Sequence, residues 1–272
     1  MICVALDRID PYPWFLNKAL ELKVNDHDVH ARITSTEWTD VWRPFLARLH
    51  DLWAANPGKR FIIGVGGPPG SGKSVFAEEL HYMIDKGVLT RDAHSVALPM
   101  DGFHFPNAYL QQHKRKLPDG SEIPLMQVKG QPDTIDVARF RKHIQSLIER
   151  PEFVPWPGYS RVLHDVVPDA IKVHKSANVV IIEGNYVLVN RGIFTGIPEM
   201  FDLRVYIDAP AGHIIASLVD RHIHGGKTKE EAKDWVKRID LPNARIAESS
   251  KMNADVVLER DADNRVVNMT WK

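Results

Sequence analysis

The sequence predicts a three-layer α/β/α fold built around a mainly parallel, five-stranded sheet. From about residue 58 onward, short apolar runs of strand length alternate with longer amphipathic segments. Strands that alternate with helices imply right-handed crossovers, which place helices on both faces of a parallel sheet. The five predicted strands span residues 61–65, 95–100, 179–182, 203–207 and 256–258. The predicted helices span residues 74–84, 135–149, 211–223 and 229–249.

Hairpins are predicted at both ends of the chain. Residues 20–24 and 29–33 alternate apolar and polar side chains on either side of the polar segment 25–28, a pattern typical of two strands joined by a turn. Residues 262–265 form a second polar turn before a short apolar run at 266–269. That run is predicted to be a final hairpin strand.

A helix is predicted between the N-terminal hairpin and the first strand of the sheet. Ser35 or Thr36 can cap its N-terminus, and the apolar spacing continues to about Ala55. Its large apolar side chains fall on one stripe: Trp38, Trp42, Phe45, Leu46, Leu49 and Trp53. A stripe at helical spacing indicates burial more often than an exposed docking face, so we expect these residues to be core.

The chain divides into two predicted units. Residues 1–57 form an N-terminal hairpin and helix packed on the core, and residues 58–272 form the main domain. Within the main domain, residues 106–165 are predicted to cover the carboxyl edge of the sheet, where open α/β sheets bind ligands. Residues 221–245 are predicted to form a lid with its following helix.

Composition and charge exclude several classes of protein. Hydrophobic residues make up 44% and charged residues 26% of the chain, as is typical of globular proteins. The 35 basic residues balance 35 acidic ones, so no net field favours nucleic acid or an anionic membrane. The single cysteine, Cys3, rules out an internal disulfide and indicates a reducing compartment. No apolar run has the form of a signal peptide or the length of a membrane span. We therefore expect a cytoplasmic protein without nucleic-acid or membrane partners, and a homodimer is left open.

A glycine-rich loop follows the first predicted strand and precedes the first helix of the sheet. It consists of Gly67-Pro68-Pro69-Gly70-Ser71-Gly72-Lys73-Ser74 and matches the phosphate-binding pattern G-x-x-x-x-G-K-[ST]. Strand, turn and helix together aim backbone N–H groups and a helix N-terminus at one point, which suits triphosphate oxygens. The pattern predicts a fold of the P-loop NTPase type that binds a nucleoside triphosphate with Mg²⁺. We expect the nucleotide to contact every residue from Gly67 to Val75.

Two other interpretations of this loop are weaker. A chance turn would have no need of glycine at both Gly70 and Gly72. A dinucleotide-binding G-x-G-x-x-G that starts at Gly64 would need glycine at position 69, which is Pro69. The phosphate loop is therefore the preferred interpretation.

Two acidic residues follow predicted strands at the loop's own edge of the sheet. Asp101 comes after the second strand and Glu183 after the third. Phosphoryl transfer to an alcohol needs a carboxylate that takes the hydroxyl proton and an acid near the metal. Asp101 as base and Glu183 near the metal fill these needs, beside Lys73 on the phosphates and Ser74 on Mg²⁺. Either acid alone could instead be a turn former or a strand terminator.

In these features the chain resembles the P-loop kinases of small metabolites, namely pantothenate kinase, uridine kinase and phosphoribulokinase. It is most similar to an uncharacterised branch that is nucleoside-kinase-like and associated with fructose transport. Besides the phosphate loop, the resemblance is carried by Met100-Asp101-Gly102-Phe103-His104 with Asn107, Lys129-Gly130-Gln131-Pro132, Pro157-Gly158-Tyr159-Ser160-Arg161-Val162-Leu163-His164, Glu183-Gly184-Asn185-Tyr186 and Arg221-His222-Ile223-His224-Gly225-Gly226. It covers nearly the whole chain and implies a kinase that phosphorylates a small molecule at a hydroxyl.

The resemblance also implies roles around the acceptor. Arg221, which precedes Gly225-Gly226, resembles a lid arginine that reaches the transferring phosphoryl group; otherwise it is a cation favoured by the helix dipole. Together with Asp101, the implied acceptor contacts are His104, Lys129, Tyr159, Arg161 and His164. Each of these could instead be a structural or surface residue. Asn243 could lie near the nucleotide base, although capping the turn after Pro242 is the simpler role.

The leading hypothesis is an ATP-dependent kinase that acts on a sugar, nucleoside or pantothenate-like acceptor. Its catalytic residues would be Asp101, Lys73, Glu183 and Arg221. A regulatory nucleoside-triphosphatase switch is an alternative from another class, although no D-x-x-G follows the loop and no N-K-x-D is present. A catalytically silent nucleotide-binding protein is a third, and the retained lysine, serine and two acids argue against it.

Overall fold

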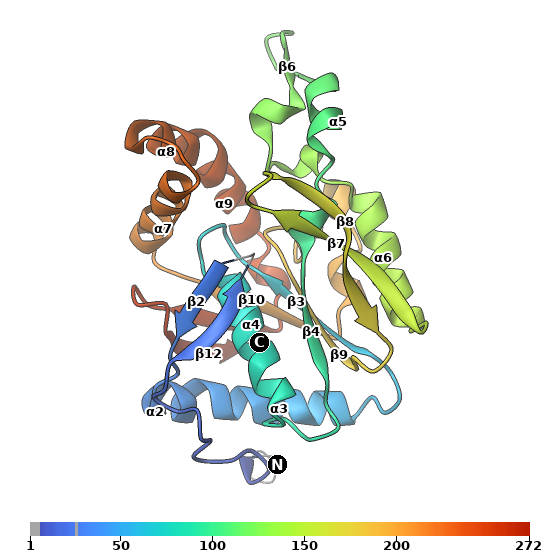
Figure 1. Cartoon of the computed structure of the whole chain (residues 1–272), viewed down its shortest axis with the longest axis vertical. Helices are drawn as coiled ribbons and strands as arrows, with labels where there is room; N and C mark the ends of the chain where they lie inside the picture. The colour runs from blue at the N-terminus through green and yellow to red at the C-terminus, as the bar shows by residue number, and fades with distance from the viewer. Residues whose placement is uncertain (1–5, 25–26) are drawn as a thin grey trace.

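The computed structural model describes residues 6–24 and 27–272. Cys3, the start of the chain and residues 25 and 26 of the predicted hairpin turn lie outside the described residues. Helices cover both faces of one central sheet, and smaller elements stand over one of its edges (Figure 1). The predicted three-layer α/β fold is confirmed.

The central sheet has six strands, in the order β12-β11-β10-β3-β9-β4. Their bounds are β3 Phe61–Gly66, β4 Ser95–Pro99, β9 Val179–Glu183, β10 Leu203–Asp208, β11 Val256–Arg260 and β12 Val266–Trp271. The first five pair in parallel and agree with the predicted strands to within two residues at each end. The prediction of five strands is wrong, because the C-terminal hairpin strand β12 pairs antiparallel with β11 and so extends the sheet.

Alternation along the strands divides the core into two layers. In β3, Ile63 packs into a cluster with α3 (Arg43–Ala54) and α4 (Lys73–Asp85). The preceding residue, Ile62, packs into the opposite cluster with α6 (Val137–Glu149). Successive strand side chains point to opposite faces, so an uninterrupted apolar strand needs cover on both sides.

Three of the four predicted helices agree with α4, α6 and α7 (Ala211–His224) to within two residues. The fourth is predicted as one helix over residues 229–249 but forms three pieces. These are α8 Lys229–Trp235, a π-helical turn Val236–Asp240 and α9 Leu241–Glu248. Pro242 lies in the first turn of α9 and has no N–H, so the regular i to i−4 bonding is interrupted at this point.

The N-terminal hairpin is confirmed as a separate two-stranded sheet. It consists of β1 Leu20–Val24 and β2 His27–Ala31, paired antiparallel. The second strand begins two residues before its predicted start at residue 29. A continuous helical segment follows, made of α2 Ser35–Glu37, a π-helical turn Trp38–Trp42 and α3.

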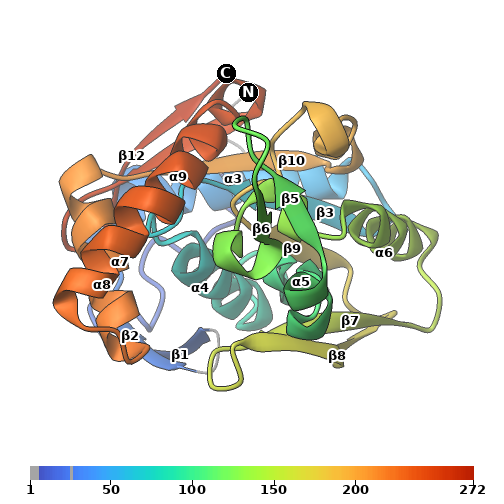
Figure 2. The ribbon, with the colours of Figure 1, turned by 90° about the horizontal axis from the view of Figure 1, so that it is seen from above.

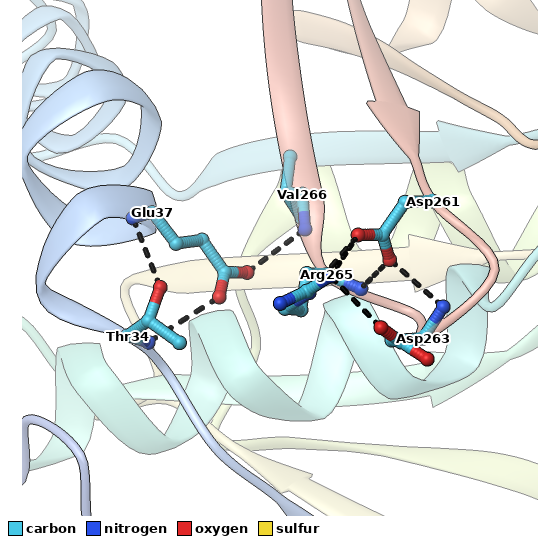
Figure 3. A network of polar contacts seen from close by, with 6 residues as sticks. All are labelled: Thr34, Glu37, Asp261, Asp263, Arg265 and Val266. Carbon is cyan, nitrogen blue, oxygen red and sulfur yellow. Dashed lines mark hydrogen bonds and ion pairs between the residues drawn. The ribbon is translucent and has the colours of Figure 1, made fainter.

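The cap of this helical segment is Thr34, so the prediction of Ser35 or Thr36 is wrong. The Thr34 hydroxyl accepts from the backbone N–H of Glu37, and the Glu37 carboxylate accepts from the backbone N–H of Thr34. This reciprocal pair is a capping box. Glu37 also accepts from the backbone N–H of Val266 at the start of β12, which joins the N-terminal unit to the end of the chain (Figure 3).

The tryptophan stripe is core, as predicted. Trp38 and Trp42 are fully buried, and Trp42 stacks on Phe76 of α4 with ring centroids 5.0 Å apart. Phe45 packs edge-on against the same Phe76 ring. Only Trp53, at the end of the stripe, remains half-buried. The N-terminal unit is thus packed directly against the helix that follows the phosphate loop.

The segment between β4 and β9 supplies most of the structure above the sheet. Its elements are α5 Asn107–Gln112, β5 Lys114–Lys116, β6 Glu122–Pro124, β7 Phe153–Ser160 and β8 Asp165–His174. Figure 2 looks down on this edge and shows α4 between α7 on one side and α5 on the other. Within the predicted covering segment, α6 is different, because it packs against a face of the sheet.

Candidate active site

The loop between β3 and α4 forms a cradle for phosphate. Gly72 has φ +81°, a left-handed conformation that favours glycine, and it directly precedes α4. Lys73 is 8% exposed, and its Nζ donates to the carbonyl oxygen of Pro68, 3.3 Å away. Burial lowers the pKa of Lys73, while the charges of Glu183 and Asp101 act in the opposite direction.

The hydroxyl of Ser71 shows that this cradle has unused hydrogen-bonding capacity. Its Oγ is buried and has no hydrogen-bond partner among the residues that the structure describes. A buried polar group without a partner is costly, and a bound phosphate would remove that cost. The loop residues therefore fit the phosphates of a nucleoside triphosphate.

A second pair of oxygens fits a magnesium ion. The hydroxyl of Ser74 donates to Oε1 of Glu183 at 2.9 Å. Glu183 ends β9, the strand between β3 and β4, so the sheet itself brings it beside the loop. Burial raises the pKa of Glu183, Lys73 opposes that rise, and Asp101 adds to it. Serine and carboxylate oxygens beside a phosphate site are the ligands that Mg²⁺ uses, with water completing its shell.

Asp101 lies in a 3₁₀ helix, Met100–Phe103, directly after β4. Burial alone would raise the pKa of Asp101, but the charges of His104, Arg161 and Lys73, with that of Arg221, hold it below its ordinary value. The carboxylate accepts no hydrogen bond from residues 6–24 or 27–272, so it does not act as a turn former there. Asp101 is therefore an ionised carboxylate that receives no hydrogen bond from the described residues.

The glycine after Asp101 is required by close packing. A Cβ on Gly102 would collide with the carbonyl oxygen of Pro157 in β7. The hairpin of β7 and β8 thus presses directly on the segment that carries Asp101. This contact brings the turn of the hairpin, residues 160–165, over the site.

His104 and Tyr159 lie together beside Asp101. His104 Nδ1 is 2.8 Å from the carbonyl oxygen of Asp101, and its ring centroid is 5.9 Å from that of Tyr159. Burial and the charge of Asp101 raise the pKa of Tyr159 to about 12. The hydroxyl of Tyr159 is therefore a neutral donor near Asp101 at physiological pH.

Lys129 is occupied by protein oxygens. Its Nζ donates to Oδ1 of Asn107 at 2.6 Å and to the carbonyl oxygen of His164 at 2.7 Å. It also lies 4.9 Å from the ring centroid of Tyr159. Lys129 thus ties three segments together beside Asp101, and its contact with an acceptor stays a prediction.

Arg161 and His164 lie on the turn between β7 and β8. Arg161 is half-buried, and its charge acts on the pKa of Asp101, Lys73 and Arg221. His164 has φ +51°, and its carbonyl oxygen is already used by Lys129 and by Asn107. The imidazole of His164 is exposed and extends toward the end of α7, 4.0 Å from where a Cβ on Gly225 would be.

Arg221 lies near the C-terminus of α7 and faces two acids. Its Nη2 is 3.4 Å from Oδ1 of Asp240, and its side chain is 39% exposed. His222 Nε2 lies 2.7 Å from the other oxygen of Asp240. Burial and the charge of Arg161 lower the pKa of Arg221, whereas Asp240 and Asp101 raise it. Arg221 is thus held at the edge of the site by the turn between α8 and α9.

Asn243 does not have the predicted capping role. It lies inside α9, is 3% exposed, and its Nδ2 donates to the carbonyl oxygen of Gly130 at 3.0 Å. Tyr186 donates to that same oxygen at 2.8 Å. Asn243 therefore joins the lid region to the K-G-x-P segment.

Two features of the site were missed from the sequence. Glu78 lies one turn after Ser74 on α4, and burial together with Glu183 raises its pKa to about 7. A signal was present, since residues four apart share one face of a helix. The second feature is a cavity of about 360 Å³ between β2, α4 and the turn from β11 to β12, bordered by Val75 and Asn264. No local pattern indicates it, because its walls are far apart in the sequence.

The fold and this geometry define a class of protein: a phosphate-loop α/β protein with acidic side chains at the loop's edge of the sheet. The model of the phosphoribulokinase / uridine kinase family matches residues 62–267, and the chain belongs to this family. Kinases of this family phosphorylate small metabolites and use ATP and Mg²⁺. No helix in the described part of the chain is long and apolar enough to cross a membrane.

Individual relatives agree with this assignment. The chain is 31% identical over 246 residues to the uncharacterised protein YggC of Escherichia coli (strain K12), across 90% of this chain and 97% of that protein. It is 28% identical to pantothenate kinase of Corynebacterium aurimucosum, across 71% of this chain and 63% of that enzyme. Among solved structures, a protein of Silicibacter sp. TM1040 assigned as a fructose transport system kinase matches with a TM-score of 0.66 and 28% identity. That match covers 78% of this chain and 98% of the other.

Proposed function

We propose that this protein transfers the γ-phosphate of ATP to a hydroxyl of a small polar metabolite, with Asp101 as the base. The observation that carries the proposal is the ionised carboxylate of Asp101, which accepts no hydrogen bond from the described residues and lies beside Lys73 and Glu183. Sugars, nucleosides and pantothenate-like acids are candidate acceptors, and the family and the pantothenate kinase relative support this range.

Each residue of the site has a defined task in this reaction. Asp101 orients the acceptor hydroxyl and takes its proton as the oxygen attacks the γ-phosphorus. The bond to the bridging oxygen breaks, and ADP leaves. Lys73 and Arg221 meet the negative charge on the transferring group. Ser74 and Glu183 would hold Mg²⁺, which neutralises phosphate charge when bound.

Lid closure would complete the site. Arg221 lies at the end of α7 with its side chain 39% exposed, and in this proposal a movement of α7 and α8 brings it onto the phosphoryl group. Closure of such an element excludes water, which would otherwise compete with the acceptor. In the same proposal, residues Gly67 through Val75 bind the nucleotide, and Tyr159 and His104 contact the acceptor.

The test is ADP formation from ATP and Mg²⁺ with a broad panel of hydroxylated acceptors. We expect at least one acceptor to raise ADP formation above the acceptor-free rate. Asp101→Asn should lower turnover at least ~10²-fold while ATP binding, followed by fluorescence titration, is retained. Asp119→Asn, on the exposed tip between β5 and β6, is the matched control and should leave turnover unchanged.

The outcome also separates the alternatives. Acceptor-independent hydrolysis with a preference for GTP would indicate a regulatory switch instead. Tight ATP binding without turnover on any acceptor would indicate a silent nucleotide-binding protein. Turnover that survives Asp101→Asn would remove Asp101 from the role of base.

A further inference from the structure

The acceptor side of the site carries two cations, and the protein itself satisfies only one of them. Lys129 donates to Asn107 Oδ1 and to the carbonyl oxygen of His164, so its charge is engaged within the fold. Arg161, on the neighbouring turn, forms no hydrogen bond or ion pair with residues 6–24 or 27–272. An arginine without partners, half-buried beside a reactive carboxylate, has donors to offer to a ligand.

The electrostatic environment of Arg161 is unfavourable in the absence of a ligand. Its charge lowers the pKa of both Lys73 and Arg221, which means that the three cations repel one another. Three acids face this group: Asp240 pairs with Arg221, Glu183 accepts from Ser74, and Asp101 is the proposed base. None of them forms an ion pair with Arg161 within the described residues. Bound anions would relieve this repulsion.

The nucleotide and the acceptor divide these cations between them. Lys73 belongs to the phosphate loop, and Arg221 comes from the lid. Arg161 instead lies two residues after Tyr159, whose ring packs beside His104 on the acceptor side of Asp101. The hairpin that carries it presses on Gly102 and belongs to the segment that covers the sheet edge.

We infer that the acceptor carries, besides its hydroxyl, an anionic group that the guanidinium of Arg161 binds. This inference rests on the proposed kinase function and narrows its substrate class to hydroxy acids or phosphorylated sugars. A guanidinium presents paired N–H donors in a planar fork that matches carboxylate and phosphate oxygens. With its anionic group held there, the acceptor would present its hydroxyl to Asp101.

The experiment compares each anionic acceptor with its neutral counterpart in the same ADP-formation assay. The carboxylate arm pairs glycerate with glyceramide and pantothenate with panthenol, and the phosphate arm pairs sugar monophosphates with the free sugars. Uridine serves as a neutral nucleoside. We expect kcat/KM for the productive anion to exceed that of its neutral counterpart at least tenfold. The arm that contains this pair identifies the group as carboxylate or phosphate.

The variant Arg161→Gln tests the residue itself. A hydrogen bond to a charged group is stronger than one between neutral groups, so this variant should lose about tenfold or more in kcat/KM on the anionic acceptor. The neutral counterpart and the KM for ATP should change little. Lys172→Gln is the matched control, since Lys172 is an exposed cation at the far end of the same hairpin.

Three results would overturn the inference, and they are distinguishable. Equal or better turnover of neutral acceptors would reject an anionic substrate while the kinase function stands. A raised KM for ATP, with equal losses on all acceptors in Arg161→Gln, would assign Arg161 to the donor phosphates. No stimulation by any acceptor would reject the kinase function, and with it this inference.

Discussion

At the scale of single residues, the site separates two neighbouring acids by their environments. The pKa of Glu183 is raised, chiefly by burial, whereas surrounding cations hold the pKa of Asp101 below its ordinary value. Two acids whose pKa values are shifted in opposite directions can take different tasks in a reaction. Here Asp101 accepts no hydrogen bond from the part of the chain that the structure describes, which suits its proposed role as base, and Glu183 accepts a hydrogen bond from Ser74.

Glu78 should make the stability of the protein depend on pH. Its pKa is raised from 4.5 to about 7, so between these values the folded protein binds a proton that the unfolded chain has lost. The associated stability is complete below pH 4.5 and is lost as the pH rises through 7. Glu78→Gln should therefore raise Tm relative to the native protein at pH 8 but not at about pH 4.5.

The measurement is thermal unfolding without nucleotide or Mg²⁺ across this pH range. Glu21→Gln, at an exposed position on β1, is the control and should show no such trend. A constant difference in Tm between Glu78→Gln and the native protein would contradict the raised pKa.

Lys129 should act by positioning the turn between β7 and β8, which carries Arg161 and His164. Lys129→Met removes two hydrogen bonds. Asn107 Oδ1 and the carbonyl oxygen of His164 each lose the donor that Lys129 supplies. We expect a higher KM for the acceptor, an unchanged KM for ATP and a loss of about 1–3 kcal/mol in the free energy of unfolding. Lys172→Met, at an exposed position on β8, is the control for loss of a lysine charge. A loss of turnover without any loss of stability would instead indicate direct contact with acceptor.

At the scale of elements, capping decides where the N-terminal helical segment begins. Thr34→Ala removes the hydroxyl that accepts from Glu37, which should cost about 1 kcal/mol in the free energy of unfolding by urea. Thr36→Ala should cost nothing, because Thr36 is exposed and alanine is a better helix former. The reverse order of the two losses would place the cap at Thr36.

The same capping acid couples distant elements. Glu37 accepts from Val266 and from Nε1 of Trp42, so one buried side chain holds the helix start, the stripe and the last strand together. The turn before that strand is ordered by Asp261, which accepts from the backbone and guanidinium of Arg265 (Figure 3). This turn also borders the cavity beside the phosphate loop.

At the scale of the whole molecule, the N-terminal unit supports the nucleotide site from behind. Trp42 stacks on Phe76, which lies three residues after Lys73 on α4. Trp42→Ala should cost about 3–5 kcal/mol in the free energy of unfolding and should weaken ATP binding where the variant remains folded. Trp53→Ala, at the half-buried end of the stripe, should cost less and leave ATP binding unchanged. Unchanged ATP binding in folded Trp42→Ala would show that the core domain holds α4 alone.

Much of the fold could be predicted because its signals are local. The phosphate loop is one contiguous run between a buried strand and a helix, and a parallel sheet brings strand ends such as Asp101 and Glu183 to one edge. The last strand was predicted as a hairpin strand but was not counted in the sheet, although a hairpin partner of the edge strand β11 necessarily extends the sheet by one strand. The interruption of the helix before Pro242 and the cap at Thr34 were predicted wrongly, because helical periodicity and the preference of Ser and Thr for caps were each applied alone.

The sequence by itself determined the layered sheet, the phosphate loop and the two acids at its edge, because periodicity and strand order carry that information. Only the tertiary structure decided which side chains are engaged and which are free. Lys129 and Asn243 donate to the backbone oxygens of His164 and Gly130, whereas Arg161 has no hydrogen-bond partner among residues 6–24 and 27–272. Those partners come from segments 35 and 113 residues away in the chain, and no local pattern encodes such contacts. The physical reason is that hydrogen bonding and burial, which set the charge and availability of a group, depend on its neighbours in space.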